Sequence, residues 1–195
     1  MNVKKGLNGV LAALVALVMV SCGQSSSNSK EQAVVQDSTL MIPAFTIATI
    51  NDSTLYNYQS ISTDGIVLIK YFSPDCSHCQ EEAKVFLSKK DSLENIRTLW
   101  TSGDWADLGK ISRFATEYQL DQLNPIAIGK ETANELLVHY GFRSVPFTAV
   151  FKDNQLIKTY EGDIDFDELI AINNGTWEPA PVVKAGEASD TEEND

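Results

Sequence analysis

Two cysteines three positions apart, Cys76 and Cys79, carry the clearest chemical signal of the sequence, in the stretch YFSPDCSHCQEEA. Thiol–disulfide exchange needs an exposed thiolate that attacks and a second thiol close enough to resolve the mixed disulfide. At the start of a helix, residues i and i+3 share one face, so this pair can close a bridge without backbone movement. Because the first helical turn stabilises a thiolate at Cys76 more than at Cys79, the pattern predicts Cys76 as the nucleophile and Cys79 as the resolving thiol.

Two other interpretations of the pair are a static bridge and half of a zinc site. A disulfide across two intervening residues closes so small a loop that it stabilises little. A four-ligand zinc site needs two more cysteines or histidines, and the candidates are His78, between the cysteines, and the distant His139. The pair is therefore interpreted as a redox couple, with no metal and no cofactor beyond the redox-active disulfide itself.

Three neighbours of the pair bear on the direction of the reaction. A protonated His78 would favour the Cys76 thiolate, stabilise the reduced form and make the couple more oxidising, although His78 can equally be a solvated residue. The negative charge of Asp75 opposes the thiolate. Lys70 either is buried, as a base or as a cation beside a thiolate, or extends its amine to the end of its strand.

The elements that position the cysteines follow from the local pattern. Residues 65–72, GIVLIKYF, are apolar and β-branched, as expected for a central strand buried on both faces. From Cys76 to about Glu94 the apolar residues have helical spacing. Glu81 and Glu82 are expected on the solvated face of this helix.

The rest of the chain between residues 41 and 175 alternates strands and helices. Two hairpins are predicted, one from strands at 44–49 and 54–59 and one from strands at 147–151 and 155–160. Single strands are predicted at 96–101 and 125–128. Helices are predicted at 104–118 with Asp104 as cap, at 130–140 ended by Gly141, and at 165–174. This order predicts one α/β domain with a central mixed sheet flanked by helices.

A second stretch, YGFRSVPFTAVFKDNQLIKTYEG at 140–162, resembles the segment around the cis-proline of thioredoxin. Together with the C-x-x-C helix start, it makes residues 41–175 similar to the thioredoxin-like superfamily. The N-terminal hairpin and the leader narrow the resemblance to TlpA/ResA-like lipid-anchored thiol-disulfide oxidoreductases of bacterial envelopes. The resemblance implies a thioredoxin-like fold with an N-terminal β-hairpin extension, a cis bond at Val145–Pro146, and binding of the substrate chain by the Val145 backbone beside Pro146.

The same resemblance implies disulfide exchange with exported proteins. It favours the reducing direction, with electrons supplied by a membrane thiol protein, and a monomeric enzyme. Lys70 departs from the thioredoxin pattern, which places a buried acid six residues before the first cysteine, so the proton route is left open.

Two alternative functions are considered. A copper-binding chaperone of this fold uses paired cysteines and a distant histidine, here His139, but its cysteines are normally separated by three residues. A thiol peroxidase of the related peroxiredoxin group carries a Pro-x-x-x-Thr-x-x-Cys pattern. That pattern is absent, because Ile69 and Ser73 stand at the proline and threonine positions.

The N-terminal residues predict export. Residues 1–21 have a charged start, an apolar middle and a small residue at their end, which is the layout of a signal peptide. Met19-Val20-Ser21-Cys22 resembles a bacterial lipobox, which implies lipidation of Cys22. Polar residues 22–40 are interpreted as a flexible tether. Because no Asp follows Cys22, the expected location is a periplasm-facing lipoprotein, on the outer rather than the inner membrane.

The charge of the chain limits its partners. Removal of residues 1–21, which hold two lysines and no acid, changes the formal charge from −12 to −14. Residues 176–195 contain six acidic residues and one lysine and are interpreted as a disordered acidic tail. An acidic protein of this kind is not expected to bind nucleic acid.

Overall fold

The computed structural model describes residues 41–51, 53–62 and 64–179. The predicted signal peptide 1–21, Cys22, the tether 22–40 and residues 180–195 of the predicted tail lie outside the described residues. A search of the described helices for a membrane-spanning segment finds none that is long and apolar enough.

One mixed sheet organises the described residues. Its strands are β1 (Thr46–Thr49), β2 (Leu55–Asn57), β3 (Ile66–Tyr71), β4 (Ile96–Ser102), β5 (Pro125–Glu131), β6 (Phe147–Lys152) and β7 (Gln155–Glu161). They follow the order β2-β1-β5-β4-β3-β6-β7, in which β3, β4 and β5 are parallel and the outer pairs are antiparallel. The predicted central strand, both hairpins and the mixed α/β sheet are confirmed.

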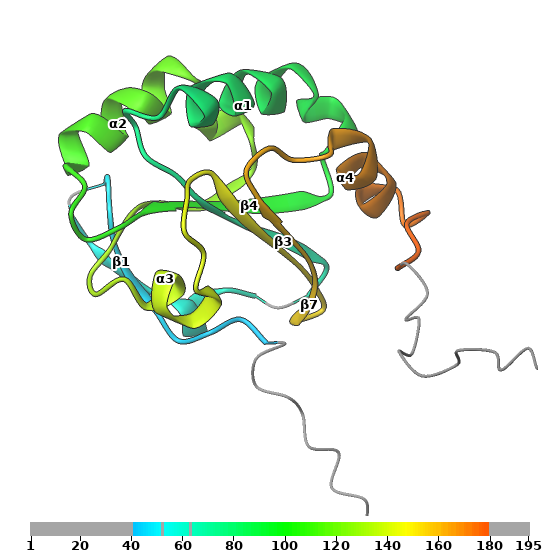
Figure 1. The fold of residues 1–195 in the computed structure, drawn as a ribbon, viewed down its shortest axis with the longest axis horizontal. Coiled ribbons are helices and arrows are strands. Elements are labelled where there is room, and N and C mark those ends of the chain that lie inside the picture. Colours follow the sequence, from blue (N-terminus) through cyan, green and yellow to red (C-terminus); the bar gives the residue numbers. More distant parts are fainter. Residues whose placement is uncertain (1–40, 52, 63, 180–195) are drawn as a thin grey trace, which may run out of the picture. The chain divides into compact units, whose positions relative to one another are not determined.

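Helices cover both faces of this sheet. They are α1 (Ser77–Ser88), α2 (Leu108–Glu117), α3 (Glu135–Tyr140) and α4 (Phe166–Asn173), with single turns η2 (Tyr58–Ser60), η3 (Lys90–Ser92) and η4 (Leu120–Gln122). Figure 1 shows α1, α2 and α4 on one face and the short α3 on the other. Two apolar clusters correspond to these layers, one containing Phe86, Ile111 and Leu169 and the other containing Leu136.

Strand β3 lies in the middle of the sheet, between β4 and β6. All six of its residues are buried, as expected for a strand with helices on both sides. Its side chains alternate between the two faces: Leu68 joins the cluster under α1, α2 and α4, and Ile69 joins the cluster under α3. By this alternation Lys70 points toward α1, and Tyr71 points toward α3.

The predicted cap of the second helix is wrong. Helix α2 begins at Leu108, and its cap is Asp107, whose Oδ1 accepts a hydrogen bond from the backbone N–H of Lys110 at 2.9 Å. Asp104 instead lies in the preceding loop, where its backbone N–H donates to Asn134 Oδ1 at 3.0 Å. Both aspartates precede the helical pattern, so the sequence alone did not separate them.

The predicted helix at 130–140 is also too long. Residues Lys130 and Glu131 belong to β5, which β1 extends by antiparallel pairing. Gly129 allows this pairing, because a Cβ at its position would lie 2.2 Å from the Ala48 carbonyl oxygen. Only α3 remains helical, and Gly141 ends it in the left-handed region at φ 64° as predicted.

Glu131, at the end of β5, is fully buried on the α3 side of the sheet. Its Oε1 accepts a hydrogen bond from the Leu136 N–H at 2.8 Å, which attaches the start of α3 to the sheet. Tyr71 and the carboxyl group of Glu135 are its neighbours. Burial, reinforced by Glu135, raises the pKa of Glu131 to about 7.

The domain continues past the predicted boundary at Gly175. The backbone N–H groups of Thr176 and Trp177 donate to the Ala171 carbonyl at 2.9 and 3.1 Å. The Trp177 Nε1–H donates to Glu168 at 2.9 Å. These two residues therefore complete the end of α4, although composition placed them in the tail.

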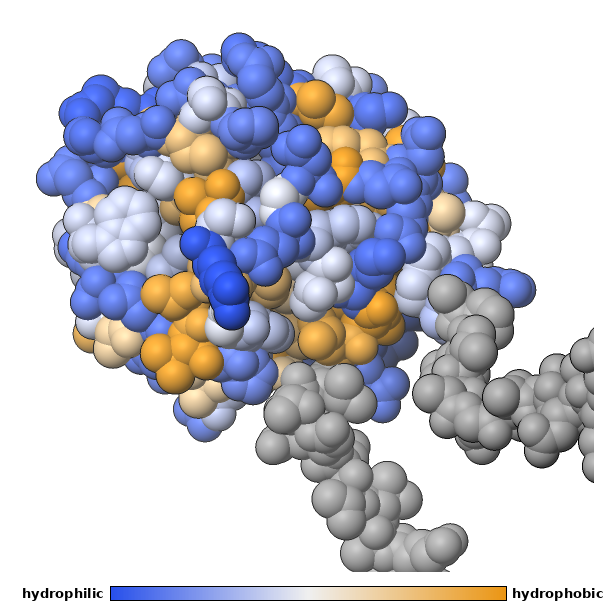
Figure 2. Space-filling view, viewed as in Figure 1, coloured by the Kyte–Doolittle hydropathy of each residue, from blue (hydrophilic) through white to orange (hydrophobic). Residues whose placement is uncertain are grey.

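The surface shown in Figure 2 is mainly hydrophilic, with separate apolar patches. Among the described residues, the large apolar side chains that are exposed are Leu55 on β2, Trp105 in the β4–α2 loop and Val138 on α3. They come from three different elements.

Candidate active site

Cys76 is the cap of helix α1, at the end of the loop that follows β3. It has an extended backbone, and its sulfur accepts the N–H of Cys79 at 3.3 Å. A sulfur in this place lies at the positive end of the helix dipole and accepts a hydrogen bond from an N–H of the first turn, and both interactions favour a negative charge on it. Cys76 is also half-buried, in contrast to the buried Cys79.

The loop before β6 lies against this sulfur. The Val145–Pro146 peptide bond is cis, and the Cys76 thiol donates to the Val145 carbonyl at 3.7 Å. Glu161 at the end of β7 holds this loop, because its Oε1 accepts the N–H groups of Arg143 and Ser144 at 2.7 and 3.1 Å. The two stretches that the sequence analysis joined by resemblance therefore meet in space.

Cys79 lies one turn further along α1 and is fully buried. Burial raises the pKa of its thiol to about 12, with Lys70 acting in the opposite direction. Both cysteines are free thiols in this structure. The two thiols therefore differ in burial: Cys76 is half-buried at the helix start, and Cys79 is enclosed.

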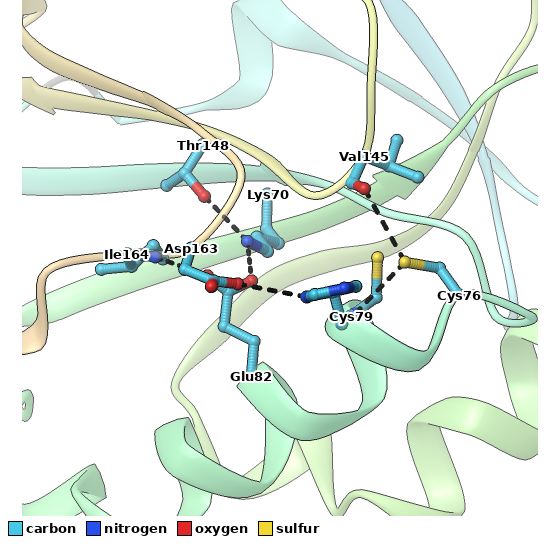
Figure 3. A network of polar contacts seen from close by, with 9 residues as sticks. Lys70, Cys76, Cys79, Glu82, Val145, Thr148, Asp163 and Ile164 are labelled. Carbon is cyan, nitrogen blue, oxygen red and sulfur yellow. Dashed lines mark hydrogen bonds and ion pairs between the residues drawn. The ribbon is translucent and has the colours of Figure 1, made fainter.

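Lys70 is fully buried behind Cys79. Its ammonium group forms an ion pair with Glu82 and donates to Thr148 Oγ1 at 2.9 Å, as Figure 3 shows. Burial lowers the pKa of Lys70, and the Glu82 carboxylate opposes that change. The alternative in which this amine extends to the end of its strand is wrong, because buried carboxylate and hydroxyl partners hold it inside.

The prediction that Glu82 lies on the solvated face of its helix is wrong. It is 5% exposed, and its Oε1 accepts the Ile164 N–H at 3.0 Å. Glu81 does lie at the surface, where it binds Lys84. Glu82 stands three residues after Cys79 and therefore shares its face of α1. That spacing, together with the need of a buried Lys70 for an anion, was the signal that could have identified it.

The two charged neighbours of Cys76 are paired with other residues. Asp75 binds Lys110 of α2 at 2.6 Å, so a cation partly offsets the negative charge beside Cys76. The Nδ1 of His78 lies 3.5 Å from Asp163, and both side chains are more than two-thirds exposed. Asp75 and His78 were predicted to act in opposite directions on the Cys76 thiolate. Each of them has a partner, Lys110 or Asp163, that the sequence did not identify and that reduces its effect.

The candidate metal ligands do not form a cluster. His139 is exposed at the end of α3, with its ring against Tyr140 at 4.7 Å. Within the part of the chain that the structure describes, no three His, Cys, Asp or Glu side chains are grouped so that they could hold a metal ion.

Solved structures of redox proteins share this fold. A secreted disulfide oxidoreductase of Mycobacterium tuberculosis, homologous to E. coli DsbE, is 17% identical over 71% of this chain and 98% of its own, with a TM-score of 0.54. The thioredoxin domain of a thiol-disulfide oxidoreductase from Bacteroides vulgatus is 12% identical over 69% of this chain and 94% of its own, with a TM-score of 0.54.

A thiol:disulfide interchange protein of the thioredoxin family from Chlorobium tepidum is 15% identical over 69% of this chain and 95% of its own, with a TM-score of 0.51. No protein-family model and no curated protein matches the sequence. At these identities the likeness shows the fold, which is thioredoxin-like as predicted.

Proposed function

We propose that this chain, which has the thioredoxin-like fold, is a thiol–disulfide oxidoreductase that uses Cys76 and Cys79. The observation that carries this proposal is the difference between the two thiols. Cys76 is half-buried at the start of α1, whereas Cys79 is buried one turn away with the Lys70–Glu82 pair behind it. A static bridge would need neither this difference in burial nor the buried charges.

In the first step the Cys76 thiolate attacks a disulfide of a partner protein. A bond forms between Cys76 and one partner sulfur, the partner disulfide breaks, and the other partner sulfur leaves as a thiolate. We propose that the Val145 carbonyl, which accepts the Cys76 thiol at 3.7 Å, accepts a backbone N–H of an extended partner chain beside Pro146 in this step.

In the second step Cys79 resolves this mixed disulfide. Its proton passes to the Glu82 carboxylate, and the Lys70 ammonium stabilises the thiolate that forms. The Cys79 sulfur then attacks Cys76, and the second partner sulfur leaves with the bonding electrons. The partner is reduced to two thiols, and the enzyme is oxidised to the Cys76–Cys79 disulfide. The buried Lys70–Glu82 pair thereby takes the role of the buried acid that the thioredoxin pattern has at the strand position of Lys70.

We propose that the reaction runs in the reducing direction. Strong oxidants of this fold stabilise their thiolate and so their reduced form. Here His78, a candidate cation for such stabilisation besides the helix start, is paired with Asp163, and burial raises the pKa of Cys79. We expect a reduction potential nearer to about −270 mV than to about −120 mV, measured by equilibration with defined thiol–disulfide buffers.

Two single substitutions test the assignment of the thiols. Cys76→Ser is expected to abolish reduction of insulin disulfides, because the attacking sulfur is lost. Cys79→Ser is expected to accumulate a mixed disulfide at Cys76, detectable by mass spectrometry, because the resolving step is lost. Insulin reduction by a folded Cys76→Ser variant would contradict the proposal.

The proposed setting is the bacterial cell envelope. We propose that Cys22 carries lipid, that the domain faces the periplasm from the outer membrane as a monomer, and that a membrane thiol protein reduces it. Exported proteins with disulfides are the proposed partners. Metabolic labelling with a fatty acid tests the anchor, since Cys22→Ala is expected to abolish the label.

A further inference from the structure

Cys79 must lose its proton at the stage when a partner protein covers Cys76. The partner reaches the site from the side where the Cys76 sulfur and the Val145 carbonyl lie, and in the mixed disulfide it is joined to that sulfur. Cys79 is itself fully buried. A proton released there needs a route that does not pass beneath the partner.

A pocket of about 300 Å³ opens at the opposite end of the polar network, between α1 and the segment that joins β7 to α4. Residues of α1 form one wall of the pocket, and residues of the β7–α4 segment form the other. The lining includes His78, Glu82 and Val85 from α1, and Asp163, Ile164 and Phe166 from the other side. In Figure 3 Cys76 and Val145 lie at one end of the network, and Asp163 and Ile164 lie at the other. The pocket therefore opens toward the end of the network away from the Cys76 sulfur and the Val145 carbonyl.

Glu82 connects this pocket to the buried charges. One carboxylate oxygen pairs with Lys70, and the other accepts the Ile164 N–H at 3.0 Å. The same side chain lines the pocket, although it is only 5% exposed. Glu82 therefore belongs both to the buried ion pair and to the lining of the pocket.

The other titratable groups at the pocket are paired. His78 and Asp163 lie 3.5 Å apart and join α1 to the segment after β7. Glu81, which also lines the pocket, binds Lys84 at 2.7 Å. The His78–Asp163 contact therefore helps to set the distance between the two walls.

We propose that this pocket is the proton exit of the resolving step and that it stays open while a partner protein occupies Cys76. The proposal rests on the proposed function. Cys79 transfers its proton to the Glu82 carboxylate, Glu82 transfers it to water in the pocket, and the Cys79 sulfur forms the bond to Cys76 while the partner thiolate leaves. Val85 is a positioning residue, because its small side chain keeps the exit open.

The first test fills the pocket. Reduced protein is mixed with 5,5′-dithiobis(2-nitrobenzoate), which releases one thionitrobenzoate when Cys76 attacks and a second when Cys79 resolves. Val85→Phe and Val85→Trp are expected to leave the first phase within about twofold and to slow the second progressively, by at least about tenfold for Trp. Ser88→Trp, an exposed position of α1 outside the pocket, is the matched control and is expected to leave both phases unchanged.

The second test rescues the missing carboxylate. In Glu82→Ala the second phase is expected to slow, and added formate is expected to restore it by entering through the pocket. In Glu82→Ala/Val85→Trp the rescue by formate is expected to be lost. A structural role of Val85 would not change this dependence on formate, and circular dichroism verifies that each variant is folded.

The outcomes separate the two proposals. A second phase that stays at the wild-type rate in folded Val85→Trp, or a rescue by formate that survives the filled pocket, would overturn the proton exit and leave thiol exchange intact. Absence of the first phase in the wild-type protein would overturn the proposed function itself.

Discussion

Replacing Glu131 with glutamine is expected to stabilise the protein increasingly as the pH rises. The carboxyl group has a pKa of about 7 in the folded protein, against an ordinary value of 4.5. Between these values the folded state binds more protons than the unfolded state, so the free energy of unfolding of the wild-type protein falls with rising pH. The group is fully buried, and its neighbour Glu135 disfavours a second negative charge.

The size of the effect follows from linkage. The contribution of Glu131 becomes about 2 kcal/mol less favourable between pH 5.5 and pH 8, and the whole difference reaches about 3 kcal/mol above pH 7. Glutamine lacks this titration and keeps an oxygen that can accept the Leu136 N–H. The window starts at pH 5.5 because the sequence isoelectric point is about 4.5, where a protein without net charge is poorly soluble.

Urea unfolding of both proteins at several pH values measures this difference. The midpoint of Glu131→Gln is expected to move away from that of the wild type by about 1 M as the pH rises from 5.5 to 8. Glu94→Gln, at an exposed position, is the control for a carboxyl without burial. An offset between Glu131→Gln and wild type that is the same at pH 5.5 and pH 8 would refute the reasoning.

Further substitutions test three other parts of the structure. Lys70→Met leaves a buried carboxylate without its cation and is expected to cost about 3–5 kcal/mol in urea unfolding. Lys70→Met/Glu82→Gln removes the buried charge and keeps an oxygen that can accept the Ile164 N–H, so it should recover most of that stability without recovering the second phase of thionitrobenzoate release. Gly129→Ala places a Cβ against the backbone of β1 and is expected to cost about 1–3 kcal/mol, with faster hydrogen exchange in β1. Asp107→Ala is expected to cost about 1 kcal/mol in thermal or urea unfolding, while a loss as large in Asp104→Ala would contradict the observed cap.

The parts of the fold that depend on local pattern were predictable. The central strand is a continuous apolar run, and the helix after Cys76 has regular apolar spacing, so each could be identified without knowing its neighbours. The end of β5 could not, because Glu131 is a strand residue only through the pairing of β5 with β1. A sequence window around Lys130 contains no information on that partner strand.

The candidate site also has one part that could be predicted from the sequence and one part that could not. The proposed roles of Cys76 and Cys79 were predicted from their spacing at a helix start. The burial of Glu82 could not be predicted, because it depends on Lys70 of strand β3 and on the backbone of Ile164, 82 residues away. A single glutamate on a helix is usually solvated, and only the three-dimensional arrangement shows that this one is enclosed.

The contacts that distinguish the two thiols join segments far apart in the chain. The Cys76 contact with Val145 spans 69 residues, and the Lys70 contact with Thr148 spans 78. Contacts of such separation form slowly, because a long loop must close before they are gained. During folding, therefore, the long-range part of the difference between the two thiols arises only when β6 pairs with β3. Before this pairing Cys79 lacks the enclosure that it has in the folded domain and is open to unwanted disulfides.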